Sequence, residues 1–141
     1  MWEKSTDDLR EELMSADSID SYLHDNEGFF FEQNITDSLE ELYERKGISK
    51  AALARQSGMS EVYLHQVFSG RRNPSRDRLL CLCIGLEATL EETQRLLKLS
   101  SYAQLYPRSK RDAIIAYGIL HHMELHAIND KLFAENERTL C

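Results

Sequence analysis

The segment from Ser49 to Ser75 carries two helix-start signals separated by a glycine, and it constrains the fold of this 141-residue chain more than any other part. Ser49 and Ser60 can each accept a hydrogen bond from a backbone N–H in the first turn of a helix. Gly58 lies between them, where the chain must turn through a positive φ that glycine adopts without strain. The pattern predicts two short helices joined by a tight turn.

Apolar residues in this segment have the spacing of two helix faces that pack against each other. Ala54 is small where the two helices would cross closely. The larger side chains that can face inward are Leu53, Met59, Leu64 and Val67. Gly70 follows them and is expected to end the second helix. The sequence therefore favours a buried interface between two crossed helices.

The same segment resembles the phage-repressor family of DNA-binding proteins, the Cro-like or Xre-like group. The similarity runs without a gap from Ile48 to Ser75 and continues more loosely to Leu86. It is most specific in the Gly-Arg-Arg-Asn-Pro-Ser sequence that starts at Gly70. The resemblance implies an all-α fold with a lambda-repressor-like helix-turn-helix domain, and double-stranded DNA as the partner.

The resemblance also implies which residues contact DNA. In the family, the first residues of the second helix meet base edges in the major groove, while the preceding helix and the following loop contact phosphates. The implied base-contacting residues are Ser60, Glu61, Val62, Tyr63 and Gln66. The implied phosphate-contacting residues are Lys50, Arg71 and Arg72. In the first group, Gln66 can form two hydrogen bonds with adenine, and Glu61 can accept one from cytosine N4.

Two residues of this segment differ from the family pattern. Glu61 stands where the family usually has a basic or amide side chain, and an acid in this first helical turn is also favoured by the helix dipole. Phe68 replaces a polar residue near the end of the same helix. The extra apolar surface at Phe68 is expected to be covered by another part of the chain, and the amino-terminal extension is the candidate.

Charge is distributed very unevenly along a chain whose net charge is −7. Residues 45–80 hold eight basic and two acidic residues, a net charge of +6. Residues 1–44 hold fourteen acidic and two basic residues, a net charge of −12. The basic excess coincides with the predicted helix pair, as expected for a surface that binds a polyanion. The acidic extension either docks on that basic face, bracing it or competing with DNA, or stays solvated.

Helix signals continue along the rest of the chain, and no segment shows the sustained alternation of a β-strand. We expect an all-α protein in three parts. These are an acidic helical N-terminal extension at 1–33, the helix-turn-helix domain at 34–88 and a C-terminal helical hairpin region at 89–141.

Two predictions concern the ends of the chain. In the extension, a short helix is expected to turn Ile19, Tyr22 and Leu23 inward, followed by an apolar run from Phe29 to Phe31. In the last helix, the residues expected to face inward are Leu125, Ile128, Leu132 and Phe133.

The carboxyl half contains an internal similarity at an offset of 35 residues. The pair Arg76-Asp77 recurs as Arg111-Asp112. Three leucines recur in the same way, Leu90, Leu97 and Leu105 as Leu125, Leu132 and Leu140. A period of this length is typical of helical hairpin repeats, so two stacked hairpins are expected. Chance similarity between amphipathic helices is the alternative.

Other features argue against several classes of protein. The N-terminal sequence lacks the pattern of a secretory signal, and the longest apolar run, 113–120, is far shorter than the roughly 20 residues that cross a bilayer. The three cysteines lack metal-site spacing. A cluster of His121, His122, Glu124 and His126 includes two histidines four residues apart, His122 and His126, which could share a metal on one helix, but a turn is expected near His122 to Met123 and no cysteine partner is nearby. No phosphate-binding loop or nucleophile motif is present. We therefore expect a cytoplasmic protein, without a membrane segment, metal or other cofactor, that is not an enzyme.

Two functions fit these patterns. The first is a bacterial or phage transcription regulator that binds double-stranded DNA sequence-specifically, as a homodimer. The alternative is a protein–protein interaction module on a repressor-like fold, with DNA binding weak or lost. In that case, the acidic extension or the C-terminal hairpins would bind the protein partner.

Removing the acidic extension tests whether it competes with DNA. A chain that begins at Asn34 loses ten acidic and two basic residues. If the extension competes, this chain binds duplex DNA more tightly than the full chain in fluorescence anisotropy, and the difference shrinks as salt screens the charges. Equal affinities at matched low salt would exclude competition.

Overall fold

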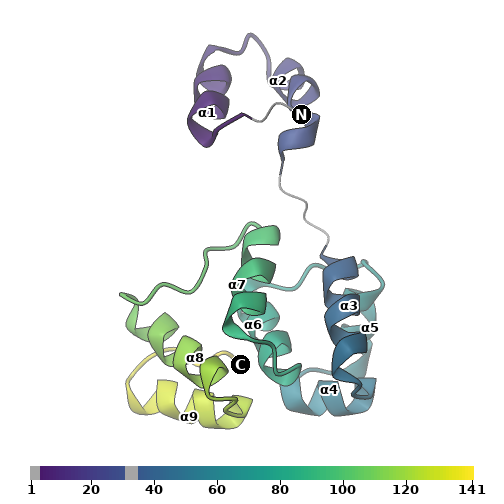
Figure 1. Cartoon of the computed structure of the whole chain (residues 1–141), viewed down its shortest axis with the longest axis vertical. Coiled ribbons are helices and arrows are strands. Elements are labelled where there is room, and N and C mark those ends of the chain that lie inside the picture. Colours follow the sequence, from purple (N-terminus) through teal and green to yellow (C-terminus); the bar gives the residue numbers. More distant parts are fainter. Residues whose placement is uncertain (1–3, 31–34) are drawn as a thin grey trace. The chain divides into compact units, whose positions relative to one another are not determined.

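The computed structural model describes residues 4–30 and 35–141, and every regular element within these ranges is a helix (Figure 1). The predicted all-α fold is therefore confirmed. The chain divides into two compact units, Met1–Phe31 and Glu32–Cys141. The expected boundary between residues 33 and 34, like Phe31 of the apolar run, lies outside the described residues.

The N-terminal unit contains α1 (Thr6–Ser15) and α2 (Ile19–Asp25), followed by a 3₁₀ turn (Glu27–Phe29). Ile19 and Leu23 are 59% and 44% exposed, so the prediction that they face inward is wrong. Two helices of this length have too little surface to enclose a core of their own.

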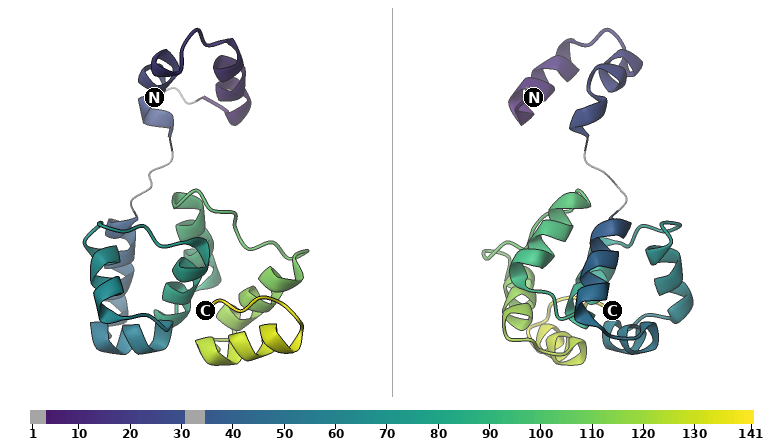
Figure 2. Two further views of the ribbon diagram at one scale, coloured as in Figure 1. Left: turned by 180° about the vertical axis from the view of Figure 1, so that it is seen from behind. Right: turned by 45° about the vertical axis from the view of Figure 1, so that its right-hand side comes forward.

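The described residues of the second unit form seven helices, five in sequence and then a last pair. The first five are α3 (Thr36–Lys46), α4 (Lys50–Ser57), α5 (Glu61–Phe68), α6 (Arg76–Gly85) and α7 (Leu90–Leu99). The last two are α8 (Lys110–Leu120) and α9 (Leu125–Ala134). Helices α6 and α7 lie between α3–α5 on one side and α8–α9 on the other (Figures 1 and 2).

Most helices of this unit begin after a serine or threonine whose side-chain hydroxyl caps the first turn. The residues whose hydroxyl accepts a hydrogen bond from a first-turn N–H are Ser49, Ser60, Ser75, Thr89 and Ser109. Thr89 and Glu92 also form the reciprocal pair of a capping box. Each cap satisfies a backbone group that the helix itself leaves without a partner, which stabilises the fold by about 1 kcal/mol.

Helix α6 is the central helix of this unit, and its residues from Leu79 to Gly85 are buried. Gly85 packs against Leu53 and Ser57 of α4. Helices α7 and α9 also contact α6. Because α6 is covered on several sides, its residues 79–85 are all apolar and show no polar face.

The α6–α7 and α8–α9 hairpins repeat each other at the 35-residue offset seen in the sequence. Glu87 and His122 follow the first helix of each hairpin with φ of 53° and 52°. Ser101 and Asn136 follow the second helix with φ of 63° and 60°. Positive φ is uncommon for residues other than glycine, so its recurrence at matching positions favours a true repeat over chance similarity.

Reciprocal ion pairs join the two hairpins. Arg76 donates two hydrogen bonds to the carboxylate of Asp112, at 3.3 and 3.1 Å. Arg111 donates two to Asp77, at 3.0 and 3.1 Å. Because each arginine pairs with the equivalent of its own neighbour, an approximate two-fold axis relates the hairpins, as in a symmetric dimer. The hairpins therefore face each other, and the expectation that they stack in a row is wrong.

The last helix differs from its prediction at one residue. Leu125, Ile128 and Leu132 are buried as expected, but Phe133 is 78% exposed, so its inward assignment is wrong. Its counterpart 35 residues earlier is Lys98, which is exposed as well. The repeat thus places Phe133 on the outer face of its hairpin.

Replacing Asp112 tests the role of the reciprocal pairs. Asp112→Ala leaves the partly buried guanidinium of Arg76 without its partner, and we expect the free energy of unfolding to fall by about 2–4 kcal/mol in urea denaturation. The matched control is Glu135→Ala, which removes the more exposed pair with Lys110 and should cost less than about 1 kcal/mol. Equal losses in the two variants would contradict the structural role of Asp112.

Candidate nucleic-acid interface

The turn between α4 and α5 has the conformation that the sequence predicts. Gly58 ends α4 with φ of 67°, and its N–H donates to the carbonyl groups of Ala54 and Arg55. The Cδ2 atom of Leu125, at the start of α9, lies 3.2 Å from the position that a Cβ on Gly58 would take. The C-terminal hairpin therefore packs directly against the turn.

Helix α5 buries one face and exposes the residues at its start. Leu64, Val67 and Phe68 are buried, which confirms that Leu64 and Val67 face inward. Glu61 is exposed, and Val62 is 69% exposed. The Ser60 hydroxyl accepts a hydrogen bond from the Tyr63 N–H at 3.0 Å, so its oxygen is already engaged in the cap.

The ring of Tyr63 lies against two arginines. The guanidinium carbon of Arg72 is 5.5 Å from the ring centroid, and that of Arg78 is 4.4 Å away. Burial raises the pKa of the Tyr63 hydroxyl from its ordinary value, although the nearby arginines oppose the shift. Arg78 is absent from the sequence-based assignment. Only its positive charge and its place beside a helix start could have indicated it.

The loop after α5 is tied to the end of that helix. The backbone N–H groups of Arg71 and Arg72 both donate to the Gln66 carbonyl, at 3.0 and 3.2 Å. Both arginine side chains are exposed, and Gln66 is partly buried. Together with Arg78, we call these two arginines the arginine cluster. This cluster borders the exposed start of α5.

Lys50 has a different environment from the one expected of a phosphate-binding residue. Its Nζ lies 3.4 Å from the centroid of the Phe68 ring and 4.3 Å from that of Tyr43. Burial lowers the pKa of the ammonium group, partly offset by the charge of Glu40. The positive charge of Lys50 therefore faces aromatic rings, an arrangement that stabilises an ammonium ion.

The same contacts correct the expectation about Phe68. Its ring packs edge-on against Tyr43, with the centroids 5.4 Å apart, and Lys50 covers it from α4. Phe68 is only 7% exposed. The apolar surface that departs from the family pattern is thus covered inside the helix-turn-helix domain, and the acidic extension is not needed for that purpose.

Four of the eight basic residues in the segment 45–80 are available to an anionic partner. Glu92 pairs with Arg45 at 2.6 Å and lies 3.9 Å from Lys46, and Arg76 pairs with Asp112. Lys50 faces the rings. Among the residues that the structure describes, the remaining members of the basic segment have no carboxylate partner: Arg55, Arg71, Arg72 and Arg78.

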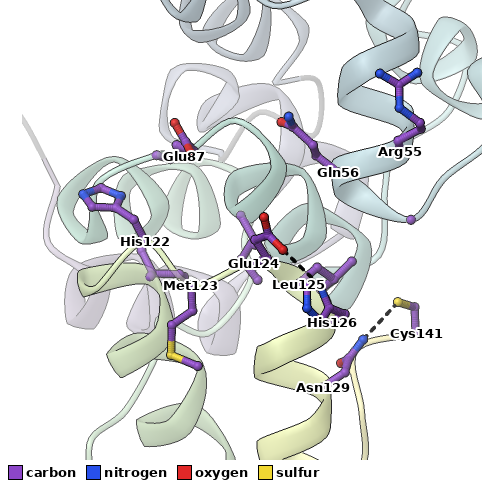
Figure 3. Close-up of a pocket in the computed structure, with 14 residues that line it drawn as sticks. Arg55, Gln56, Glu87, His122, Met123, Glu124, Leu125, His126, Asn129 and Cys141 are labelled. Carbon is purple, nitrogen blue, oxygen red and sulfur yellow. Dashed lines mark hydrogen bonds and ion pairs between the residues drawn. The ribbon is translucent and has the colours of Figure 1, made fainter.

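The predicted histidine cluster lies at a cavity of about 430 Å³ beside the end of α4 (Figure 3). His122, Glu124 and His126 line it, together with Arg55 from α4. Glu124 is 3.2 Å from His126 and forms an ion pair when that histidine is protonated. Within the described parts of the chain, no three potential metal ligands converge.

None of the helices in residues 4–30 and 35–141 has both the length and the apolar composition that crossing a bilayer requires. Burial raises the pKa of the Cys81 and Cys83 thiols to about 12, which keeps both in the neutral form. These two cysteines therefore act as small apolar residues of the core.

Comparison with known families identifies the domain. Residues 36–96 match the family model described as a helix-turn-helix domain. This match covers α3 to α6 and most of α7, and it includes every residue of the α5 face and the arginine cluster. No curated protein and no solved structure matches the chain. The segment from residue 36 to residue 96 is thus a helix-turn-helix domain, a type of domain that binds DNA.

Two glycines with the same backbone conformation allow the effect of the Leu125 contact on stability to be measured separately from backbone strain. Gly47 and Gly58 both have φ of 67°, but only Gly58 has a neighbour where a Cβ would be placed. Alanine at either position should lower the free energy of unfolding by about 1–2 kcal/mol through backbone strain. Gly58→Ala should lose more than Gly47→Ala because of the crowding with Leu125. Equal losses in thermal denaturation would show that α9 does not constrain the turn.

Proposed function

We propose that this chain is a transcription regulator of the Cro-like or Xre-like kind, bacterial or phage, that binds double-stranded DNA sequence-specifically. The observation that carries the proposal is the arginine cluster beside the exposed start of α5. Its three cations have no carboxylate partner among the described residues, and they flank the helix that enters the major groove in helix-turn-helix proteins.

The proposed base contacts come from the exposed side of α5. Glu61 would accept a hydrogen bond from cytosine, and Gln66 would pair with adenine. Val62 and Tyr63 would pack against the thymine methyl group. Ser60 contributes through the start of the helix, because its hydroxyl is engaged in the cap. These contacts would determine which operator sequence the protein prefers.

The proposed phosphate contacts come from the loop after α5 and from α6. Arg71 and Arg72 are exposed, and Arg72 and Arg78 both lie against the ring of Tyr63. Lys50 contributes less than these arginines, because its ammonium group lies over the Phe68 ring. Contacts of this kind position the protein on the duplex without reading its sequence.

Salt dependence and substitutions test the proposal together. The logarithm of the binding constant should fall by about 0.9 per decade of salt for each phosphate neutralised. Arg71→Ala should weaken binding to all duplexes alike and reduce this slope by about one phosphate contact. Gln66→Ala should change the preferred base at one position, with discrimination altered by about 1–3 kcal/mol.

The matched control is Lys98→Ala, which removes an exposed cation of α7 outside the interface and should change neither affinity nor slope. Lys50→Ala should reduce the affinity less than Arg71→Ala. If the full chain binds no duplex at low salt, or if Lys98→Ala acts like Arg71→Ala, the DNA-binding proposal fails. A protein–protein interaction module, acting through the N-terminal extension or the C-terminal hairpins, would then be the better account.

A further inference from the structure

The cavity of about 430 Å³ shown in Figure 3 is lined by residues from the ends of four helices. Most of these residues come from the C-terminal ends of α4, α6 and α8 and from the first two turns of α9. The volume lies within the range of about 300–1,000 Å³ that sites for small molecules occupy. None of the proposed DNA contacts lines the cavity, so the DNA interface leaves it without a role.

The cavity lies on the approximate two-fold axis that relates the two hairpins. Three pairs of its lining residues are repeat equivalents, 35 residues apart: Ile84 with Ile119, Glu87 with His122, and Ala88 with Met123. Residues related by a two-fold axis lie on opposite sides of it, so a space bounded by three such pairs is crossed by the axis. The facing hairpins therefore create the cavity, and the end of α4 adds a side that the repeat does not supply.

The floor of the cavity is apolar and its rim is polar. The buried side chains that form the floor are Ile84, Ala88, Ile119 and Leu125. The exposed polar side chains that form the rim are Arg55, Gln56, Glu87, His122, Glu124 and His126. An apolar floor with a few polar groups around it is the usual composition of a small-molecule site. Such a site suits a molecule with an apolar body and one polar or charged group.

Two carboxylates of the rim lack a permanently charged partner. Among the described residues, the Glu87 carboxylate forms no ion pair. Glu124 lies 3.2 Å from His126, whose ring is charged only when it is protonated. Both carboxylates are therefore available to a cation that enters the cavity.

The helix ends add partial negative charge to the same place. Gly58, Glu87 and His122 follow α4, α6 and α8, and all three residues line the cavity. The dipole of each helix places partial negative charge at its C-terminal end. Among the described lining residues, Arg55 alone carries a permanent positive charge, and its guanidinium points away from Glu124 in Figure 3. The electrostatics of the cavity thus favour a positively charged ligand.

We propose that this cavity binds a small organic cation, an amine attached to an apolar body, as an effector of the regulator. The apolar body would lie on the floor formed by the two hairpins and Leu125. The ammonium group would stay at the rim, attracted by the carboxylates of Glu87 and Glu124. A carboxylate or phosphate ligand of the same shape would be repelled by the same two groups.

The effector role deepens the proposed function and rests on it, because the cavity borders the turn between α4 and α5. Gly58 of that turn lines the cavity, and Leu125 of α9 lies 3.2 Å from where its Cβ would be. A bound cation would contact both sides of this junction. If the cation and the operator favour different arrangements of the junction, each changes the affinity of the other by the same factor.

Titration of the ¹⁵N-labelled full chain with phenethylamine tests the site by NMR without DNA. We expect saturable chemical-shift changes at the amide groups of Glu87, Met123 and Leu125. 2-Phenylethanol has the same apolar body without the charge and should bind about 5- to 20-fold more weakly, and the anion 3-phenylpropionate should bind more weakly still. Equal affinities for the three compounds would overturn the choice of a cation. Absence of saturable changes with phenethylamine would overturn the site.

Substitutions at the rim test the role of the carboxylates. Glu87→Gln and Glu124→Gln should each weaken phenethylamine binding by about 2- to 5-fold, because each removes one exposed negative charge. The matched control is Glu91→Gln, which removes an exposed acid of α7 outside the cavity and should change nothing. Arg55→Gln should leave the affinity unchanged or raise it. Weaker binding in Arg55→Gln would show that an anionic group is held, and it would overturn the proposal.

Substitution at the floor tests whether the ligand occupies the cavity itself. Ala88→Met places at this position the residue that its repeat equivalent, Met123, already has, and it fills part of the cavity. A folded Ala88→Met chain, checked by far-UV circular dichroism, should bind neither phenethylamine nor 2-phenylethanol. Unchanged binding in this variant would overturn the site. If Ala88→Met does not fold, Met123→Ala serves instead and should weaken both compounds alike, because it removes only an apolar contact.

Duplex binding with and without phenethylamine separates the effector role from the proposed function. A saturating concentration should change the affinity of the full chain for duplex DNA by about 5-fold or more. The same concentration should have no such effect on Ala88→Met, which controls for the ionic strength that the amine adds. A duplex affinity that saturation leaves unchanged would overturn the effector role. A chain that binds the amine but binds duplex under neither condition would sustain the site and overturn the proposed function.

Discussion

The ion pair between Arg76 and Asp112 fixes the part of the molecule on which the rest is assembled. Asp112 is 8% exposed, and its carboxylate accepts hydrogen bonds from Arg76 and from the Tyr106 N–H. Arg76 also donates to the Ala103 carbonyl at 2.9 Å. A carboxylate this deeply buried is tolerated only with such partners, because removing a charge from water costs several kcal/mol. The pair therefore sets how α6 and α8 meet, and α6 in turn supports the helix-turn-helix pair.

The C-terminal hairpin reaches α4 and α5 by two routes. One route passes through α6, which contacts both α4 and α9. The other is direct, because Leu125 lies against Gly58 in the turn between α4 and α5. Residues beyond the segment that matches the helix-turn-helix family thus hold α4 and α5 in place. The sequence suggests a division near residue 88, but the parts before and after it belong to the same compact unit, Glu32–Cys141.

The sequence predicted the features that depend on a few consecutive residues. It did not predict the features that depend on how separate helices pack. Ser60 and Gly58 are recognisable because a cap and a positive φ each depend on a few consecutive residues. The environment of Lys50 depends on Tyr43 and Phe68, which meet only after three helices have packed. Arg78 joins the candidate interface for the same reason. Phe133 was misassigned because a helix boundary alone does not show which sides of a helix are covered.

The two-fold contact between the hairpins joins two parts of a single chain. Separate subunits with the same contacts would dissociate on dilution, but the connector from Ser100 to Ser109 holds the two halves at an effective concentration that dilution cannot change. The pairing of Arg111 with Asp77 is therefore a first-order equilibrium, insensitive to how much protein a cell contains. The platform that supports α4 and α5 would persist at any dilution at which the chain stays folded.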